Sequence, residues 1–414
     1  MNAAYYKKTK FTCFFTYLAT ASIFVLPAML FVTFREMYHI SYTLLGTLVL
    51  INFCTQLGID LIFTFFSKHF NIHKTIRLMP LLTSLGLIIY ALFPFFFPDI
   101  AYVGLVTGTV IFSVAAGLCE VLLSPLVAAM PSEHPEKDMS LLHSLYAWGI
   151  LMVIVLSSAY LHFFGRENWM YLALFWALLP LASCVLFWTS PLPPMDLTAP
   201  DPGKSGSKQA FGLALCVLCI FLGSAAENTM TNWISAYVES ALGISKTLGD
   251  LLGMASFALL LGIARVLHAK YSWNIFKVLF YGMIGAAICY LIVTFSPSPM
   301  LSLSACIFTG LFTSMLWPGS LILMEEKFPR LGVTAYALMA AGGDFGASVA
   351  PQMLGAIADG IAASPWAEKM APALSMTAEQ LGMKSGMLAA SVFPLLGVIL
   401  LLYMKQYFKK HSAL

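Results

Sequence analysis

The sequence predicts an all-α membrane protein with twelve transmembrane helices in two six-helix bundles. Three observations indicate this fold class: the composition, the length of the apolar stretches and an internal repeat. The chain has 414 residues, of which 60% are hydrophobic and only 10% are charged, whereas about 25% of residues are charged in soluble proteins. Because a helix needs about 20 apolar residues to cross a bilayer, twelve such helices with short loops account for the whole length.

The apolar stretches give the position of each predicted helix. In the first half they are 11–34, 42–67, 76–97, 101–130, 141–164 and 169–188. In the second half they are 210–238, 248–269, 275–295, 299–324, 333–360 and 386–404. A hydrophilic segment rich in Pro, Gly and Ser separates the halves. We therefore expect an N-terminal bundle in 1–188, a cytoplasmic linker in 189–209 and a C-terminal bundle in 210–414.

Lys and Arg determine the predicted orientation, because cytoplasmic loops of membrane proteins are enriched in these residues. With the N-terminus inside, only five of the 22 Lys and Arg residues lie outside, which leaves 17 inside. Both termini are therefore predicted to be cytoplasmic. The outside loop at 361–385 has Thr377 followed by Gln380, a spacing that can cap a short helix.

An internal repeat relates the two halves. A shift of 193 residues aligns GLCEVLLSPLVAAMP at 117–131 with GLFTSMLWPGSLILM at 310–324. The aligned pairs are Gly117 with Gly310, Pro125 with Pro318, Glu120 with Thr313 and Ser124 with Trp317. A shift of 204 aligns 40–44 with 244–248 and 58–59 with 262–263. Two parallel repeats about an axis along the membrane normal are typical of one large class of transporters.

The basic loop SKHFNIHKTIRL at 67–78 resembles a degraded form of the loop signature of the major facilitator superfamily. Its usual Asp-Arg-x-Gly-Arg-Arg core is replaced here, so the usual acidic gating contact is not expected. The segment LLHSLYAWG at 141–149, which follows a glutamate in the fourth span, is similar to the fucose-permease-like branch of sugar–proton symporters. The resemblance covers essentially the whole chain and implies the major facilitator fold.

Four acidic residues inside apolar spans are the predicted proton-coupling residues. A charged side chain in the middle of a bilayer costs about 2.5–3.5 kcal/mol on insertion scales, so such residues commonly have a function. Glu120 is the first choice, since the resembling symporters use a glutamate in their fourth span. The others are Asp60, Glu227 and Asp344. The alternative for each is a structural role in helix packing or capping.

Amide, imidazole and indole side chains within the spans are the predicted substrate contacts. Amides can hydrogen-bond the hydroxyl groups of a solute, and an indole offers a flat apolar face to a sugar ring. The predicted residues are Asn228, Trp317, His143, Gln56, Asn52, Trp148 and Trp233, although an aromatic residue in a span more often serves packing. Lys68, Lys74 and Arg265 are predicted gating residues. Arg265 has two further interpretations, a snorkelling interfacial residue or a counter-ion of Asp344.

The function expected from these features is secondary active import of a small polyhydroxylated solute, in first place a monosaccharide, by proton symport. The chain has no nucleotide-binding loop, and we expect no enzyme activity, catalytic residue, metal site, cofactor or nucleic-acid partner. H⁺ is the expected coupling ion, with Na⁺ as the alternative. A monomer in the bacterial cytoplasmic membrane, surrounded by lipid, is expected. The alternatives are a proton-coupled exporter of drugs or amphipathic metabolites and a sensor or binding protein that does not transport.

Overall fold

The computed structural model of the chain describes residues 3–66, 69–133, 135–195, 207–271, 273–328 and 332–410. It divides into two compact units. The N-terminal unit comprises 1–39 and 51–198, and the C-terminal unit comprises 40–50 and 199–414. All regular elements in the described residues are helices, and ten of them are long and apolar enough to cross a membrane. The predicted all-α membrane fold is confirmed.

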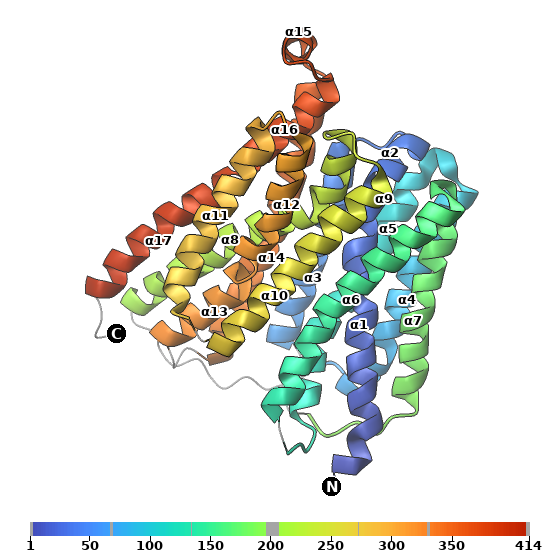
Figure 1. Cartoon of the computed structure of the whole chain (residues 1–414). Helices are drawn as coiled ribbons and strands as arrows, with labels where there is room; N and C mark the ends of the chain where they lie inside the picture. The colour runs from blue at the N-terminus through green and yellow to red at the C-terminus, as the bar shows by residue number, and fades with distance from the viewer. Residues whose placement is uncertain are drawn as a thin grey trace. The chain divides into compact units, whose positions relative to one another are not determined.

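The helices of the first half correspond to the first six predicted spans (Figure 1). They are α1 (Lys7–Met29), α2 (Phe31–Tyr38), α3 (Tyr42–Phe66), α4 (Ile72–Phe96), α5 (Ala101–Ala128), α6 (Pro135–Phe164) and α7 (Trp169–Trp188). Three short 3₁₀ helices accompany them, η1 (Ala3–Tyr6), η3 (Pro98–Ile100) and η4 (Arg166–Asn168). Of the predicted linker, 196–206 lies outside the described residues.

The second half has more helices than predicted spans. The eighth, tenth and twelfth spans each consist of more than one helix, and α15 (Pro365–Ala373) lies in the loop before the twelfth. Its helices are α8 (Ser207–Ser240), α9 (Lys246–Leu248), the π-helix η5 (Gly249–Ala255), α10 (Ser256–Tyr271), α11 (Ile275–Phe295), α12 (Pro299–Thr313), α13 (Leu316–Lys327), α14 (Gly332–Ala362), α15 (Pro365–Ala373), α16 (Ala378–Ala390) and α17 (Val392–Lys410). The eighth span thus consists of α9, η5 and α10, and the tenth of α12 and α13.

Side-chain caps fix where several of these helices begin. The side chain of Asn71 accepts a hydrogen bond from the Lys74 N–H at 3.1 Å, and that of Asn274 accepts one from the Lys277 N–H at 3.0 Å. The two caps belong to similar stretches, NIHK before α4 and NIFK before α11. At α16, Thr377 and Gln380 form the predicted capping box, with both reciprocal hydrogen bonds present.

The repeat is visible in the way the helices pack within each unit. In the N-terminal unit α1 packs beside α6, and α4 packs between α5 and α7. In the C-terminal unit α8 packs beside α14, and α11 packs with α12 and α17. The first and fifth helices of each half are therefore neighbours, as are the third, fourth and sixth (Figure 1).

Aligned glycines of the repeat make the same close contact in both units. A Cβ atom added at Gly117 of α5 would lie 2.9 Å from the Cβ of Ile59 on α3. A Cβ atom at Gly310 of α12 would meet the backbone oxygen of Phe257 on α10. In each unit the fourth span therefore approaches the second span at a point where no side chain fits, and small residues permit such contacts between membrane helices.

Gly310→Ala is expected to destabilise the C-terminal unit, because the new methyl group meets backbone that cannot move aside. Overpacking of this kind costs about 1–3 kcal/mol. Gly262→Ala on α10 is the matched control, since nothing lies within 4 Å of a Cβ atom there. Thermal unfolding in detergent should show a lower Tm for Gly310→Ala and an unchanged or higher Tm for Gly262→Ala. Equal Tm values would contradict the close contact.

Candidate functional site

A buried polar stripe runs along α3 in the N-terminal unit. Asn52, Gln56 and Asp60 lie four residues apart and therefore share one face of the helix, and each is at most 8% exposed. The Gln56 amide donates to Asn52 Oδ1 at 3.0 Å, and the Ser113 hydroxyl of α5 donates to the same oxygen at 2.6 Å. The stripe thus joins α3 to α5 through hydrogen bonds.

Glu120 of α5 lies beside the end of this stripe. Carboxylate oxygens of Asp60 and Glu120 are within 4.8 Å of each other. The contact between Gly117 and α3, one turn earlier on α5, brings the two carboxylates together. Asp60 is buried, whereas the Glu120 side chain is exposed. An exposed carboxylate in the middle of an apolar span is expected to face water rather than hydrocarbon, because hydrocarbon would leave its charge without partners. Two predicted coupling residues therefore form one pair.

Glu227 of α8 is paired with Arg265 of α10 in the C-terminal unit. Glu227 Oε1 lies 3.2 Å from Arg265 Nη2, and Arg265 Nε donates to the backbone oxygen of Ser314 at 2.9 Å. The Ser314 oxygen is available because its usual helical partner would be the N–H of Pro318, which proline lacks. The break between α12 and α13 therefore provides the group that orients the Arg265 guanidinium.

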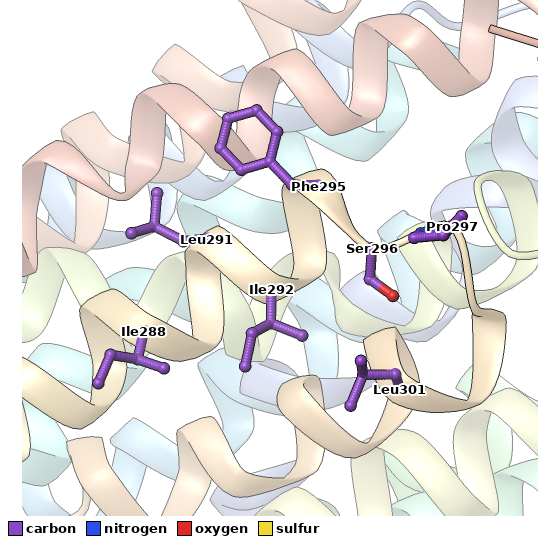
Figure 2. Close-up of a pocket in the computed structure, with 7 residues that line it drawn as sticks. All are labelled: Ile288, Leu291, Ile292, Phe295, Ser296, Pro297 and Leu301. Carbon is purple, nitrogen blue, oxygen red and sulfur yellow. The ribbon is translucent and has the colours of Figure 1, made fainter.

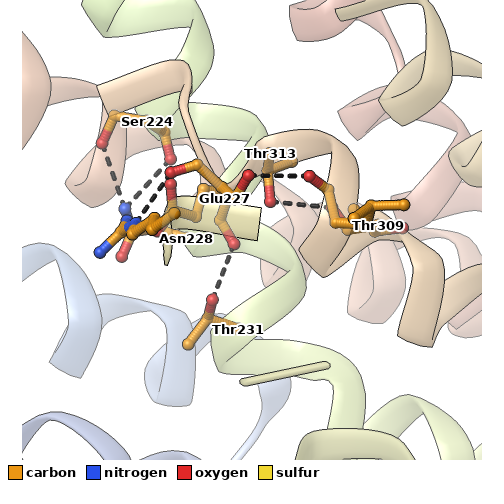
Figure 3. A network of polar contacts seen from close by, with 9 residues as sticks. Ser224, Glu227, Asn228, Thr231, Thr309 and Thr313 are labelled. Atoms are coloured by element: carbon orange, nitrogen blue, oxygen red, sulfur yellow. Dashed lines mark hydrogen bonds and ion pairs between the residues drawn. The ribbon is translucent and has the colours of Figure 1, made fainter. Parts of the chain in front are cut away.

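Hydroxyl and amide groups lie near Glu227 (Figure 3). The Asn228 amide donates to the Ser224 hydroxyl at 3.1 Å and to its carbonyl at 3.2 Å, and Thr313 donates to the Thr309 carbonyl at 2.9 Å. Glu227 Oε2 is buried and accepts no hydrogen bond from the described residues. The second carboxylate oxygen is thus available to a proton or to a donor group of a solute.

The three predicted tryptophans lie in different surroundings. Trp317 of α13 is half-buried, with its six-membered ring against Gly343 of α14. Trp148 of α6 is 59% exposed. Trp233 of α8 is fully buried and donates its indole N–H to the Pro351 oxygen at 3.0 Å. In this structure Trp233 packs between helices, and its contact with a substrate stays a prediction.

Four predicted residues remain, namely Asp344, Lys74, Lys68 and His143. Asp344 is buried on α14, at 3% exposure. Lys74 is exposed on α4. Lys68 and the side chain of His143 lie outside the described residues. The Arg265 guanidinium is bonded to Glu227 and to the Ser314 oxygen, and the side chain is 35% exposed.

A second ion pair, which is buried, was missed by sequence reasoning. Lys246 Nζ lies 3.1 Å from Asp250 Oδ2, and the two residues are 6% and 0% exposed. Ser235 of α8 donates to Asp250 and accepts a hydrogen bond from Lys246 at 3.2 Å. The predicted eighth span began at 248, which placed Lys246 in a loop. The signal was present, since a lysine and an aspartate four residues apart share one helix face.

An apolar groove of about 430 Å³ lies at the end of α11 (Figure 2). Its lining residues are Ile288, Leu291, Ile292, Phe295, Ser296, Pro297 and Leu301. The lining has one hydroxyl and no charged or amide side chain, so it lacks the polar groups that would orient a polyhydroxylated solute. The polar clusters around Glu120 and Glu227 are therefore the candidate site residues.

Comparison with profiles of known protein families gives one match. Residues 10–351 match the profile of the Major Facilitator Superfamily. The protein belongs to this superfamily. Its members are transporters, and an enzyme is therefore not indicated. A comparison with curated protein sequences finds no significant match.

Solved structures of transporters share the fold of this chain. A D-xylose–proton symporter has a TM-score of 0.77 at 16% identity, with 97% of this chain and 98% of that chain covered. A bacterial homologue of the human lysosomal transporter Spinster has a TM-score of 0.75 at 15% identity and 99% coverage of both chains. The E. coli fucose–proton symporter has a TM-score of 0.56 at 14% identity, with 95% and 99% covered. At these identities the likeness shows the fold alone.

Loss of one partner of the Lys246–Asp250 pair is expected to destabilise the protein strongly. Asp250→Leu or Lys246→Met leaves one buried charge unpaired, which costs about 3–5 kcal/mol, whereas the double variant removes both charges and should recover much of the loss. Arg166 and Glu36 form an exposed pair at the same distance, 3.1 Å, and serve as the matched control. Glu36→Gln should change stability by about 1 kcal/mol or less. Tm values that add across the two single variants would contradict coupling.

Proposed function

We propose that the protein imports a small polyhydroxylated solute, in first place a monosaccharide, together with a proton across the bacterial cytoplasmic membrane. The observation that carries the proposal is the pair formed by Asp60 and Glu120, whose carboxylate oxygens are within 4.8 Å of each other. A transporter that couples a solute to protons needs a group that gains and loses one proton in each cycle. This pair provides such a group on two membrane helices.

Two adjacent carboxylates favour holding one proton between them, because two negative charges at this distance repel. The exposed Glu120 exchanges this proton with water. The negative charge of the buried Asp60 lies close enough to favour the protonated form of Glu120. In the protonated state the pair carries one negative charge fewer, so the cost of moving it through an apolar environment falls. Alternating access between the two sides of the membrane then carries proton and solute together.

The energy available from one proton is sufficient for useful accumulation. A gradient of one pH unit supplies about 1.4 kcal/mol per proton, which supports about tenfold accumulation of a neutral solute. A membrane potential of 100 mV adds about 2.3 kcal/mol per charge. A neutral solute such as a monosaccharide adds no charge of its own. The number of protons carried per solute molecule therefore follows directly from the ratio of inside to outside solute concentration.

The uncharged polar groups of the clusters suit a solute with hydroxyl groups. Asn52, Gln56 and Ser113 form one group of amides and hydroxyls, and Asn228 with Ser224 forms another. The half-buried ring of Trp317 adds an apolar face. An exporter of amphipathic cations is less well supported, because Arg265 already neutralises Glu227 and leaves fewer free carboxylates as counter-charges.

Uptake of a radiolabelled monosaccharide panel into proteoliposomes, with and without an inward proton gradient, tests the proposal. We expect gradient-dependent accumulation by the parent protein. In Glu120→Gln it should fall by about tenfold or more, while exchange of labelled for unlabelled solute persists, because glutamine resembles the protonated carboxyl group. Glu36→Gln, which changes an exposed acid, is the control and should transport like the parent.

Three outcomes would overturn parts of this proposal. Gradient-driven uptake that survives Glu120→Gln would move the coupling site to Asp60, Glu227 or Asp344. Efflux of an amphipathic cation without sugar uptake would favour the exporter. Binding of a solute without transport by any variant would favour a sensor.

A further inference from the structure

The apolar groove at the end of α11 opens on the face of this helix that is turned away from the core of the C-terminal unit. Tyr281, Ile288 and Phe295 are exposed, and because they lie seven residues apart, which is about two helical turns, they share this face. Ile288 and Phe295 also line the groove (Figure 2). Since α11 is long and apolar enough to cross a membrane, its exposed apolar face is expected to contact lipid. The groove is therefore open to the acyl chains of the bilayer.

The polar turn after α11 marks the level of the lipid head groups. The helix has 21 residues, so its length is about 32 Å at about 1.5 Å per residue, close to the hydrocarbon thickness of about 30 Å. Ser296, Pro297 and Ser298 form the turn to α12, and the Ser298 hydroxyl accepts a hydrogen bond from the Leu301 N–H at 3.4 Å. The charge distribution predicts this end to be external. The groove thus extends from the outer head-group level into the hydrocarbon.

Lys384 of α16 places a positive charge at this level. Its ammonium donates to the Ser296 carbonyl at 2.8 Å and to the Thr294 carbonyl at 3.4 Å, and Ser296 lines the groove. The last carbonyls of a helix lack helical partners and attract a cation, so the two bonds hold the ammonium beside the end of α11. Both acceptors are uncharged, and the ion pairs found among the described residues do not include Lys384. Because an ammonium has three donors, one donor and the whole charge are available to an anion.

The head group, more than the acyl chain, decides which lipid binds here. An acyl chain that enters the groove from the bilayer leaves surroundings as apolar as the groove itself, so burial alone gives it little preference. A phosphate, in contrast, forms a charge-assisted hydrogen bond with an ammonium. In phosphatidylethanolamine the lipid's own ammonium already compensates the phosphate, whereas phosphatidylglycerol has a net negative charge. The uncompensated charge of Lys384 therefore favours an anionic phospholipid.

We propose that the groove and Lys384 form a binding site for one anionic phospholipid of the outer leaflet. One acyl chain lies against Ile288, Ile292 and Leu301 of the groove. A phosphate oxygen accepts the third hydrogen bond of the Lys384 ammonium, whose other two bonds go to the end of α11. The bound lipid contacts residues of α11, α12 and α16 at once, so it stabilises the packing of these helices at their outer ends. Lys384 thereby has two roles, as a cap of α11 and as a ligand of the head group.

Native mass spectrometry of the purified full chain in detergent, titrated with phosphatidylglycerol or with phosphatidylethanolamine, counts the lipids bound to each protein molecule. We expect the parent to bind its first phosphatidylglycerol about fivefold more tightly than its first phosphatidylethanolamine. Lys384→Gln should lose this preference, and Lys384→Arg should keep it because arginine retains the charge. Lys369→Gln, which changes an exposed lysine of α15 in the same unit, is the matched control and should bind both lipids like the parent.

Leu301→Trp tests the groove without a change of charge. Leu301 is exposed at the start of α12 and lines the groove, so a larger side chain there occupies the space of the acyl chain and leaves the core intact. We expect this variant to bind both lipids about fivefold more weakly than the parent. The Tm of each variant without added lipid shows that the protein is folded. If Lys384→Gln does not fold, the comparison of Leu301→Trp with the parent still decides.

A preference for phosphatidylglycerol that survives Lys384→Gln, or that the parent lacks, would overturn the head-group site and leave Lys384 as a cap of α11. Unchanged binding of both lipids by Leu301→Trp would overturn the groove as the place of the acyl chain. A loss of the same size in Lys369→Gln would overturn the site as a whole, because any lysine of this surface would then serve. The measurement uses neither a solute nor a gradient, so its result is independent of the proposed transport.

Discussion

A charged side chain inside a membrane helix requires a partner, and this requirement organises both units. Three kinds of pairing between charged side chains occur in the described part of the chain. Asp60 faces a second carboxylate, Glu120, which favours a shared proton. Glu227 faces the guanidinium of Arg265, and Lys246 and Asp250 neutralise each other with a serine between them. Of these three pairs, the first alone has two charges of the same sign, which is why we propose proton coupling there.

The backbone of the repeat provides the places where these partners meet. Gly117 brings α5 onto α3 next to Asp60, and its counterpart Gly310 brings α12 onto α10 in the same way. Pro318 leaves the Ser314 carbonyl without a helical partner, and Arg265 binds this oxygen. The glycine and proline positions are common to both halves, whereas the charged residues differ. The two units therefore share their helix packing and differ in the charged side chains that this packing brings together.

The sequence alone was sufficient for the fold class, the approximate spans and the cap at Thr377, because apolar length and local spacing determine them. It also singled out Glu120 and Asp60, because an acid in an apolar stretch stands out by composition, and the structure shows that their carboxylates are close together; their role in coupling stays a prediction. It did not identify the partner of Arg265 or the buried state of Lys246. These depend on the rotation and crossing of helices that are far apart in the chain, which no local pattern specifies.

We propose that Asp60 and Glu120 together hold one proton. Infrared spectroscopy of the purified protein at neutral pH tests this claim directly, because a protonated carboxyl group has a C=O stretching band that a carboxylate lacks. We expect such a band in the parent protein, its loss in both Asp60→Asn and Glu120→Gln, and its persistence in Glu227→Gln. A band that is absent from the parent, or that survives both substitutions, would contradict it.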